Sequence, residues 1–398
     1  MGFSDANKFL EQTGPLADPP SGGLLDACTA LDGPPSGFER VWAAFEPMEV
    51  MQKRGQILRP QTGEAWQFLC DEGAALGGTD WAPPPLAYFA AGLASSILGA
   101  VVEKAAAHGI PSSAVSVAVD NHYSLRGSIL AGTMEGLGQN PDVSVGINSD
   151  ALSAQEKSSL ALEAVSSVLA GYLMKSVFTS AFNVIANGKQ IALDLTHWDQ
   201  EIKASALPIA ALDASRSGVG ASGAAYVAKM SLRPDDPSFI ASGGSGVDLV
   251  QNRSTVVSAA AATAADTLGN GIFTVDSGIG RPGAAIYQFL GAPDAGAVGA
   301  PSSACLIAAG IGFCFMTQLG RYAEAKKRPV HDYRMIQAID IPLPGSDGSQ
   351  TPVIGTKLFL NLSEPDADFA GDLANSARRT CFLHSTLQAN LRSKIVVT

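Results

Sequence analysis

The residues best suited to chemistry are two cysteines and a histidine in the C-terminal third of the chain. His384 follows Cys381 by three positions, so the two side chains share one face if the segment is helical. A cysteine and a histidine within reach can form a nucleophile–base pair, which suits hydrolysis, thiol addition and peroxide reduction. Cys314 lies in the apolar run Ile-Gly-Phe-Cys-Phe-Met, where a small buried hydrophobic residue is the alternative interpretation. For His384 the alternative is a histidine at a helix surface or a polar core residue.

The other cysteines give weaker signals. The chain has five in all: Cys28, Cys70, Cys305, Cys314 and Cys381. They are too few and too scattered for a disulfide framework, and without CxxC pairs they predict no zinc site. Cys305 falls near the start of an expected helix, where the dipole favours a thiolate, but packing is the preferred interpretation. Cys28 and Cys70 are interpreted as structural.

Two stretches of the chain share short motifs in the same order. The first contains Arg59-Pro60, Gln67-Phe68-Leu69 and Ala90-Ala91-Gly92, and the second contains Arg281-Pro282, Gln288-Phe289-Leu290 and Ala308-Ala309-Gly310. A further ungapped alignment pairs residues 177–191 with 381–395. Ser96 then matches Cys314, and Val177 matches Cys381. The shared order predicts two copies of one unit, of which only the second carries both cysteines.

The elements expected to position these residues are similar in the two copies. A long apolar helix is expected at 84–108 and again at 302–327. Expected strands cover 115–119, 125–130 and 143–147 in the first copy, and 335–341 and 353–362 in the second. A second helix is expected to begin at Ser153, where Glu156 completes a capping box, and at Ser363, with Asp366 in the corresponding place. Strands interleaved with two long helices indicate an α+β layer fold.

These expectations divide the chain into four parts. They are an N-terminal extension (1–40), a first copy (41–192), a connecting segment rich in Gly, Ser, Ala and Asp (193–253), and a second copy (254–398). The glycine-rich stretches 218–223 and 243–246 lack the GxxxxGK[ST] pattern, so nucleotide binding is not predicted. The segment 196–199 and His331 are interpreted as loop residues.

Four features in order resemble the OsmC/Ohr family of thiol peroxidases: a hairpin arginine, a glycine-rich loop, a helix with Ala-Ala-Gly-x-x-x-Cys, and a later Cys followed by Thr-Leu. The matching residues are Arg281, Ala308-Ala309-Gly310 with Cys314, and Cys381 with Thr386-Leu387. Members of this family are usually intertwined homodimers with active sites at the subunit interface. The resemblance therefore implies two tandem OsmC-like units that form an intramolecular pseudo-dimer, the first of them degenerate.

The resemblance also assigns roles. Cys314 would attack the O–O bond of an organic hydroperoxide and become a sulfenic acid, which Cys381 would trap as a disulfide. Arg281, or Arg59 from the other copy, would stabilise the thiolate. The family carries a Glu at the helix start, ten residues before the attacking Cys, and here that position is Ala304. This departure supports the alternative of a repurposed hydrolase or lyase that acts on a small organic substrate between the copies.

Composition limits the other classes of function. The net charge of −11 argues against a nucleic-acid surface, and the 46% hydrophobic fraction suits a protein with a large core. Without a signal-like start or an uncharged apolar run of about 20 residues, a cytoplasmic protein that does not bind membranes is expected. No cofactor and no metal are predicted. A small organic substrate is the expected partner, with a dithiol reductant and homo-oligomers left open. A non-catalytic binding module is the third hypothesis.

Overall fold

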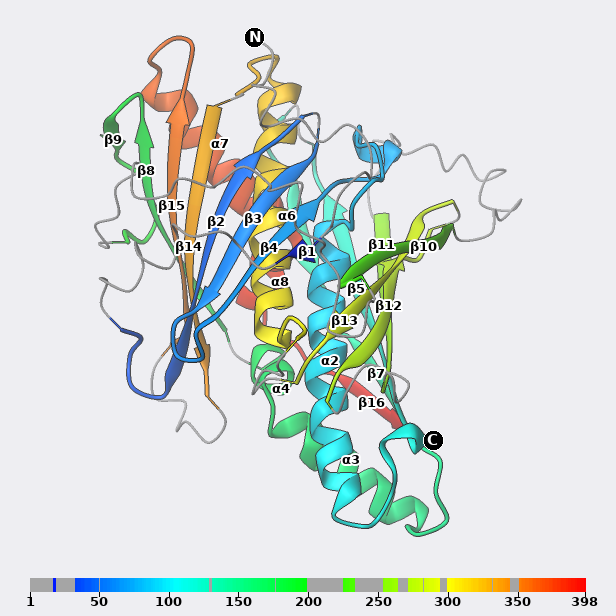
Figure 1. Ribbon diagram of the computed structural model, residues 1–398. Helices are drawn as coiled ribbons and strands as arrows, with labels where there is room; N and C mark the ends of the chain where they lie inside the picture. The colour runs from blue at the N-terminus through cyan, green and yellow to red at the C-terminus, as the bar shows by residue number, and fades with distance from the viewer. Residues whose placement is uncertain are drawn as a thin grey trace.

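The computed structural model of the protein describes most of the chain. The described residues are 17–18, 33–49, 51–128, 131–175, 177–198, 225–232, 253–263, 271–281, 283–293, 299–330, 332–343 and 351–398. Two mixed sheets enclose two long central helices, and further helices lie against this core (Figure 1). The fold is therefore α+β, as the sequence predicts.

The first sheet combines strands from both ends of the chain. Its order is β1 (Ala17–Asp18), β4 (Glu64–Cys70), β3 (Lys53–Arg59), β2 (Phe38–Pro47), β14 (Asp332–Pro342), β15 (Val353–Asn361), β8 (Thr179–Ala186) and β9 (Lys189–Ile191). The central pairing of β2 with β14 is antiparallel and places Trp42 opposite Ala338. β15 and β8 run parallel. The N-terminal meander is thus completed by strands that lie about 300 residues later.

In the second sheet the two halves of the chain exchange roles, so that the second half supplies the meander and the first half supplies strands beside it. Its order is β10 (Val227–Leu232), β13 (Ala285–Gly291), β12 (Phe273–Ile279), β11 (Arg253–Thr263), β5 (Val115–Arg126), β7 (Asp142–Ile147) and β16 (Lys394–Val397), with β6 (Glu135–Gly138) paired to β5. Antiparallel pairing of β11 with β5 places Ala259 opposite Val119. β16 runs parallel to β7. Each sheet therefore joins a three-stranded meander from one half of the chain to strands from the other half.

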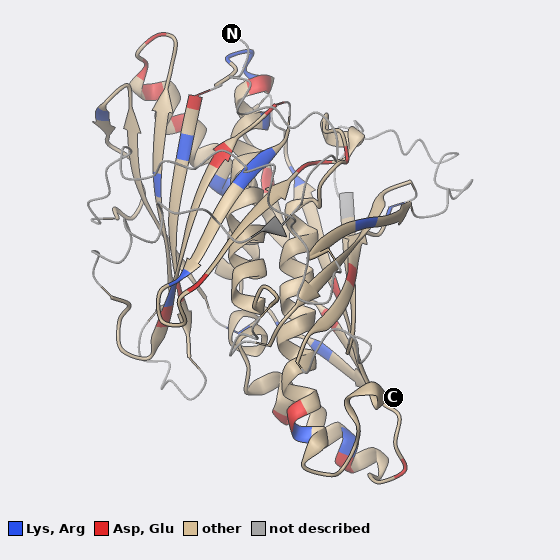
Figure 2. Cartoon of the chain, in the orientation of Figure 1, with Lys and Arg blue, Asp and Glu red and all other residues tan. Residues whose placement is uncertain are grey.

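Two apolar helices, α2 (Pro85–Ala106) and α6 (Ser303–Ala325), pack against each other between the sheets. α2 contacts β5, β11 and β12, whereas α6 contacts β2 and β3. Both helices lack charged residues over most of their length (Figure 2), as helices buried all round do. By length and composition either could cross a membrane, but 94% of each apolar window is buried inside the protein, as in a core helix.

Glycines set the closeness of this helix pair. A Cβ at Gly92 would lie 2.8 Å from the Ser303 carbonyl oxygen, and one at Gly310 would lie 2.9 Å from the Pro85 carbonyl oxygen. Each glycine therefore accepts the first turn of the other helix. The Ala-Ala-Gly motif that recurs in the sequence is the crossing point.

Four shorter helices complete the described part. They are α3 (Ala154–Ser166), α4 (Leu169–Leu173), α7 (Ala367–Thr380) and α8 (Phe382–Gln388). The predicted capping box at Ser153 and Glu156 is confirmed. In α7 the predicted start at Ser363 is wrong: Asp366 is the N-cap, accepts from the Phe369 N–H and receives Arg328 as well. The Asp366 carboxylate caps α7 because it lies within reach of the free N–H groups of the first turn, whereas Ser363 lies three positions too early in the chain.

The predicted long helices and the strands at 143–147, 335–341 and 353–362 are confirmed to within a few residues. The separate strand predicted at 125–130 is wrong, because β5 continues unbroken from Val115 to Arg126 and residues 129–130 lie outside the described part. β2 begins at Phe38, before the predicted boundary at 41, and β10 forms within the predicted connecting segment. Cys28, Pro282, His331 and both glycine-rich stretches lie outside the described residues.

The pairing of Val177 with Cys381 is also wrong. Cys381 lies between α7 and α8, whereas Val177 lies two residues before the start of strand β8. In the first half, Ser167 and Val168 lie between the two short helices, and Val168 is the N-cap of α4. Short ungapped matches were too weak to locate the helix boundary. Ser96, which the repeat pairs with Cys314, lies in α2, and its Oγ accepts from the Ala170 N–H at the start of α4.

The helix crossing gives a direct stability test. Gly310→Ala is expected to lower the free energy of unfolding by about 1 to 3 kcal/mol, because the added methyl overpacks against backbone atoms of Phe89 and Pro85. Gly320→Ala on the same helix is the matched control, since its nearest atom is the Tyr333 Oη at 3.8 Å. That change is expected to raise stability by up to about 1 kcal/mol through helix propensity. Urea unfolding of both variants measures the difference, and equal effects would contradict close packing at Gly310.

Candidate functional site

The structure brings Cys314 and Cys381 together in the core. Cys314 lies in the middle of α6 and is 2% exposed, and Cys381 at the α7–α8 junction is 0% exposed. Both are free thiols. Burial raises the pKa of Cys381 well above its usual value, and the neighbouring Cys314 side chain, as a hydrogen-bond partner, raises it further. A raised pKa means that Cys381 holds its proton at neutral pH.

His384 contacts this pair from α8. Its Nδ1 lies 3.2 Å from the Cys381 Sγ, and its ring packs against Phe315 and Phe182. Burial, and then the positive charge of Arg378, lowers the pKa of His384 to about 3. The imidazole is therefore neutral at neutral pH, and in one tautomer Nδ1 accepts the thiol hydrogen of Cys381. Within the described part of the chain, its Nε2 has no hydrogen-bond partner.

Local backbone geometry explains where Cys381 points. α7 ends because Cys381 adopts an extended conformation, with φ of −71° and ψ of 115°, and α8 starts at the next residue. The backbone N–H groups of His384 and Leu383 act on the Cys381 sulfur and lower its pKa, against the effect of burial. β6 approaches this junction closely, since a Cβ at Gly136 would lie 2.5 Å from the Thr380 carbonyl oxygen. Gly136 thus allows β6 to pack directly against the α7–α8 junction that carries Cys381.

Tyr123 is a member of this site that sequence reasoning missed. It projects from β5, and its pKa is raised well above the usual value, first by burial and then by Cys314 and Cys381 nearby. Its ring lies 5.3 Å from that of Phe382, and its hydroxyl has no hydrogen-bond partner among the described residues. Strand alternation could have placed Tyr123 inside the core, but not beside thiols from the other half of the chain.

A small hollow adjoins Tyr123. It has a volume of about 10 Å³, and its lining includes Asn121, Leu173 and Thr386 as well as Tyr123. This is room for about one water molecule.

A buried polar group lies along the same face of α6. Thr317, one turn after Cys314, donates to the Glu72 carboxylate at 2.6 Å. Burial raises the pKa of Glu72, and it lowers that of Arg321, whose guanidinium interacts with Glu72 and with Cys314. The spacing of three and seven residues after Cys314 places Thr317 and Arg321 on its face, so the sequence held a signal for both. Arg321 therefore brings a positive charge close to Cys314.

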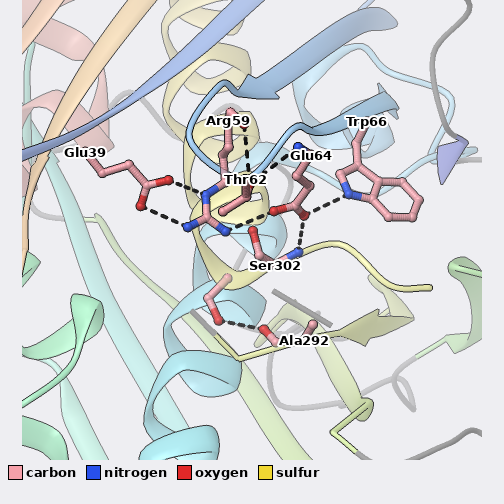
Figure 3. Close-up of polar contacts among 8 residues, drawn as sticks. Glu39, Arg59, Thr62, Glu64, Trp66, Ala292 and Ser302 are labelled. Atoms are coloured by element: carbon pink, nitrogen blue, oxygen red, sulfur yellow. Dashed lines mark hydrogen bonds and ion pairs between the residues drawn. The ribbon is translucent and has the colours of Figure 1, made fainter. Parts of the chain in front are cut away.

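Arg59 lies elsewhere, at the start of α6 (Figure 3). Its Nε and Nη2 donate to Glu39, and its Nη1 donates to Glu64 at 2.9 Å. Burial by itself lowers the pKa of Arg59, but Glu39 and Glu64 outweigh that effect and raise it. Glu64 also accepts from the Trp66 Nε1 and from the Ser302 N–H. A carboxylate thus reaches the helix start from the β3–β4 hairpin instead of from Ala304 on the helix itself.

This arrangement separates Arg59 from Cys314. The cysteine that Arg59 and Glu64 influence is Cys305, whose pKa is raised well above its usual value, first by burial and then by Glu64. Nine residues of α-helix separate Cys305 from Cys314, about 13.5 Å along the axis. The prediction that Arg59 stabilises the Cys314 thiolate is not supported by this placement. The packing interpretation of Cys305 overlooked a charged neighbour, which comes from a distant hairpin.

Arg281 occupies the end of the other hairpin, after β12. It lines a pocket of about 250 Å³ together with residues 73–76, Asp80 and Pro84, close to the start of α2. Cys314, Cys381 and His384 are thus brought together as predicted, whereas Arg59 and Arg281 each lie at a hairpin end. Among the described residues, no group of three or more His, Cys, Asp and Glu side chains is placed to hold a metal ion.

Compared with protein-family models, with curated proteins and with solved structures, the chain matches none. The function proposed below therefore depends on the residues and contacts of this chain.

The neutral, buried His384 makes stability depend on pH. In the unfolded chain His384 binds a proton below its ordinary pKa of 6.5, whereas in the folded protein it stays neutral down to about pH 3. The free energy of unfolding therefore falls as the pH is lowered across this range. Between pH 7 and pH 4.5 the loss from this group is expected to reach about 2 to 3 kcal/mol. His384→Asn, which cannot titrate, should lose that much less in urea unfolding at the two pH values. An unchanged difference between the two pH values would contradict a neutral His384.

Proposed function

We propose that this protein is a cysteine-dependent peroxidase that reduces organic hydroperoxides with the pair Cys314 and Cys381. The observation that carries the proposal is the contact of these two thiols, which α6 and the α7–α8 junction bring together in a closed site. A dithiol that can close to a disulfide performs two-electron chemistry, which matches the reduction of one peroxide bond.

We propose further that the chain consists of two OsmC-like units joined as an intramolecular pseudo-dimer. Two features support this. Each half repeats the order of a three-stranded meander, a long helix, two or three further strands and two shorter helices, and the halves exchange strands through β2–β14 and β11–β5. The site itself draws on both halves, since Tyr123 comes from the first and both thiols come from the second. Such a site suits the interface of an intertwined dimer.

The proposed chemistry proceeds in two steps. The Cys314 thiolate attacks the distal oxygen of ROOH, so that an S–O bond forms, the O–O bond breaks and the alkoxide leaves, taking a proton as ROH. The sulfur is oxidised and the peroxide is reduced by two electrons. Cys381, as thiolate after proton loss to His384, then attacks the Cys314 sulfenic sulfur; the S–S bond forms and water leaves. An external dithiol reductant returns the disulfide to the dithiol.

The neighbours of the pair have matching roles in this proposal. The Arg321 guanidinium interacts with Cys314 and so brings a positive charge close to the proposed nucleophile. The Tyr123 hydroxyl, which has no hydrogen-bond partner among the described residues, is available to hydrogen-bond a peroxide or alkoxide oxygen. The His384 Nδ1, 3.2 Å from the Cys381 Sγ, is the group placed to accept the Cys381 proton, and its pKa of about 3 makes this transfer costly in the resting state. Arg321 and Tyr123 take the places that the family resemblance assigned to a hairpin arginine.

One observation favours a second candidate, a repurposed OsmC-like hydrolase or lyase. The 3.2 Å contact between His384 Nδ1 and Cys381 Sγ is the distance of a nucleophile and its base. In this case Cys381 would be the nucleophile and Cys314 would be dispensable. The two candidates therefore differ in which cysteine is essential.

Stopped-flow oxidation of the reduced protein by cumene hydroperoxide tests the leading proposal. The wild type should lose two of its five thiols at a rate about a hundredfold above that of free cysteine, the low end of what positioned acid–base groups contribute. Cys314→Ser should abolish the fast phase. Cys381→Ser should keep it but stop at a sulfenic acid, which dimedone labelling detects.

Cys70→Ser is the matched control, because Cys70 is also a free and fully buried thiol. It should leave both phases intact. Oxidation no faster than that of free cysteine would rule out the peroxidase. Turnover of an ester or thioester that requires Cys381 and survives Cys314→Ser would establish the second candidate instead.

A further inference from the structure

The small hollow beside Tyr123 is lined by two buried polar side chains whose donors have no partner. Asn121 and Tyr123 are two positions apart on β5, so both lie on the core side of the sheet, and they are 4% and 1% exposed. Among the described residues, neither the Asn121 Nδ2 nor the Tyr123 Oη has a hydrogen-bond partner. A buried donor without a partner costs free energy, so the two side chains indicate a place where a ligand or a water accepts from them.

The rest of the lining suits an apolar group. It comes mainly from α2, the end of α4, α8 and the segment after α8, and includes Phe89, Leu93, Leu173, Met174, Leu387 and Leu391. Sites for small molecules are typically apolar in this way, with a few polar groups that orient the ligand. Cys314 and Cys381 both act on the Tyr123 hydroxyl, so this residue connects the hollow to the thiol pair.

One part of the lining is suited to move. A volume of about 10 Å³ is too small for an organic hydroperoxide, so the hollow must widen to admit one. Residues 389–393 join α8 to β16 without regular structure, and Leu391 is their one large apolar side chain. The hydrogen bonds that join this segment to other elements include Arg392 N–H to Asn140 Oδ1 at 2.8 Å and Ser393 Oγ to Met174 Sδ at 3.1 Å. Irregular backbone with few buried apolar contacts opens locally at low cost.

We propose that the hollow is the binding site of the organic hydroperoxide, where Asn121 Nδ2 and Tyr123 Oη donate to the peroxide oxygens and the 389–393 segment opens to admit the apolar group. That group packs against Leu93 and Leu387. This inference rests on the proposed peroxidase function and adds the site and the entry route of its substrate. Two donors at the oxygen that leaves as alkoxide stabilise the charge that develops there as the O–O bond breaks.

Leu391→Ala in the full-length, reduced protein tests the entry route. Because the variant lacks most of a buried side chain that closes the hollow, stopped-flow oxidation by cumene hydroperoxide should become about threefold faster or more. Oxidation by hydrogen peroxide, which has no apolar group to admit, should change much less. Leu162→Ala, at an exposed position of α3, is the matched control and should change neither rate.

Asn121→Leu tests the donor, because it removes the amide at a similar side-chain volume. Oxidation by both peroxides should slow about tenfold or more, since the leaving oxygen loses a hydrogen-bond donor. Alkylation of Cys314 by iodoacetamide, followed by mass spectrometry, should keep its rate, because it breaks no O–O bond. A purely structural effect of the substitution would change both reactions. Asn361→Leu, at the exposed end of β15, is the matched control and should leave both unchanged.

The outcomes separate this site from the peroxidase proposal. Wild-type oxidation no faster than that of free cysteine would overturn both. Fast oxidation that requires Cys314 but is unchanged in Leu391→Ala, or unchanged in folded Asn121→Leu, would overturn the site and leave the peroxidase standing. Equal changes in oxidation and alkylation in Asn121→Leu would overturn the donor role. If Asn121→Leu does not fold, Leu391→Ala still decides, because it only removes atoms from a segment without regular structure.

Discussion

The close crossing of α2 and α6 is the constraint on which the rest of the structure depends. Gly92 and Gly310 each admit the first turn of the opposite helix, so the two backbones approach to a distance that any side chain would prevent. α6 rests on β2 and β3, and α2 rests on β5, β11 and β12, so this crossing also sets the spacing of the sheets. Cys314 lies one turn beyond Gly310. The position of the proposed nucleophile is thus fixed by the same contact that fixes the core.

Burial determines the chemistry of both polar clusters in the core, in opposite ways. Around Cys381 it keeps the thiol protonated and His384 neutral, so that no full charge is needed there in the resting state. Around Arg59 the charge is retained, because Glu39 and Glu64 both pair with the guanidinium. Charging either group of the first cluster is costly, so this cluster rests in its neutral form. The second is held in one state and anchors the start of α6.

The sequence predicted the parts of the fold that depend on local pattern. The apolar run 302–327, the capping box at Ser153 and the contact between Cys381 and His384 all follow from residues a few positions apart. What could not be predicted depends on contacts across the chain. Tyr123 reaches the thiols only because β5 joins β11, and Glu64 replaces the missing helix carboxylate only because its hairpin lies over Ser302. The mismatch of Val177 with Cys381 has the same origin, since helix ends are set by packing that a short alignment does not contain.

The exchange of strands has a consequence for synthesis of the chain. When the first 192 residues have left the ribosome, β2 and β5 are both present, but their partners β14 and β11 are not. Each of these strands then offers a row of unpaired backbone groups, the condition in which sheets pair with the wrong chain. The nascent first half therefore exposes open sheet edges at β2 and β5 until the strands of the second half have been synthesised.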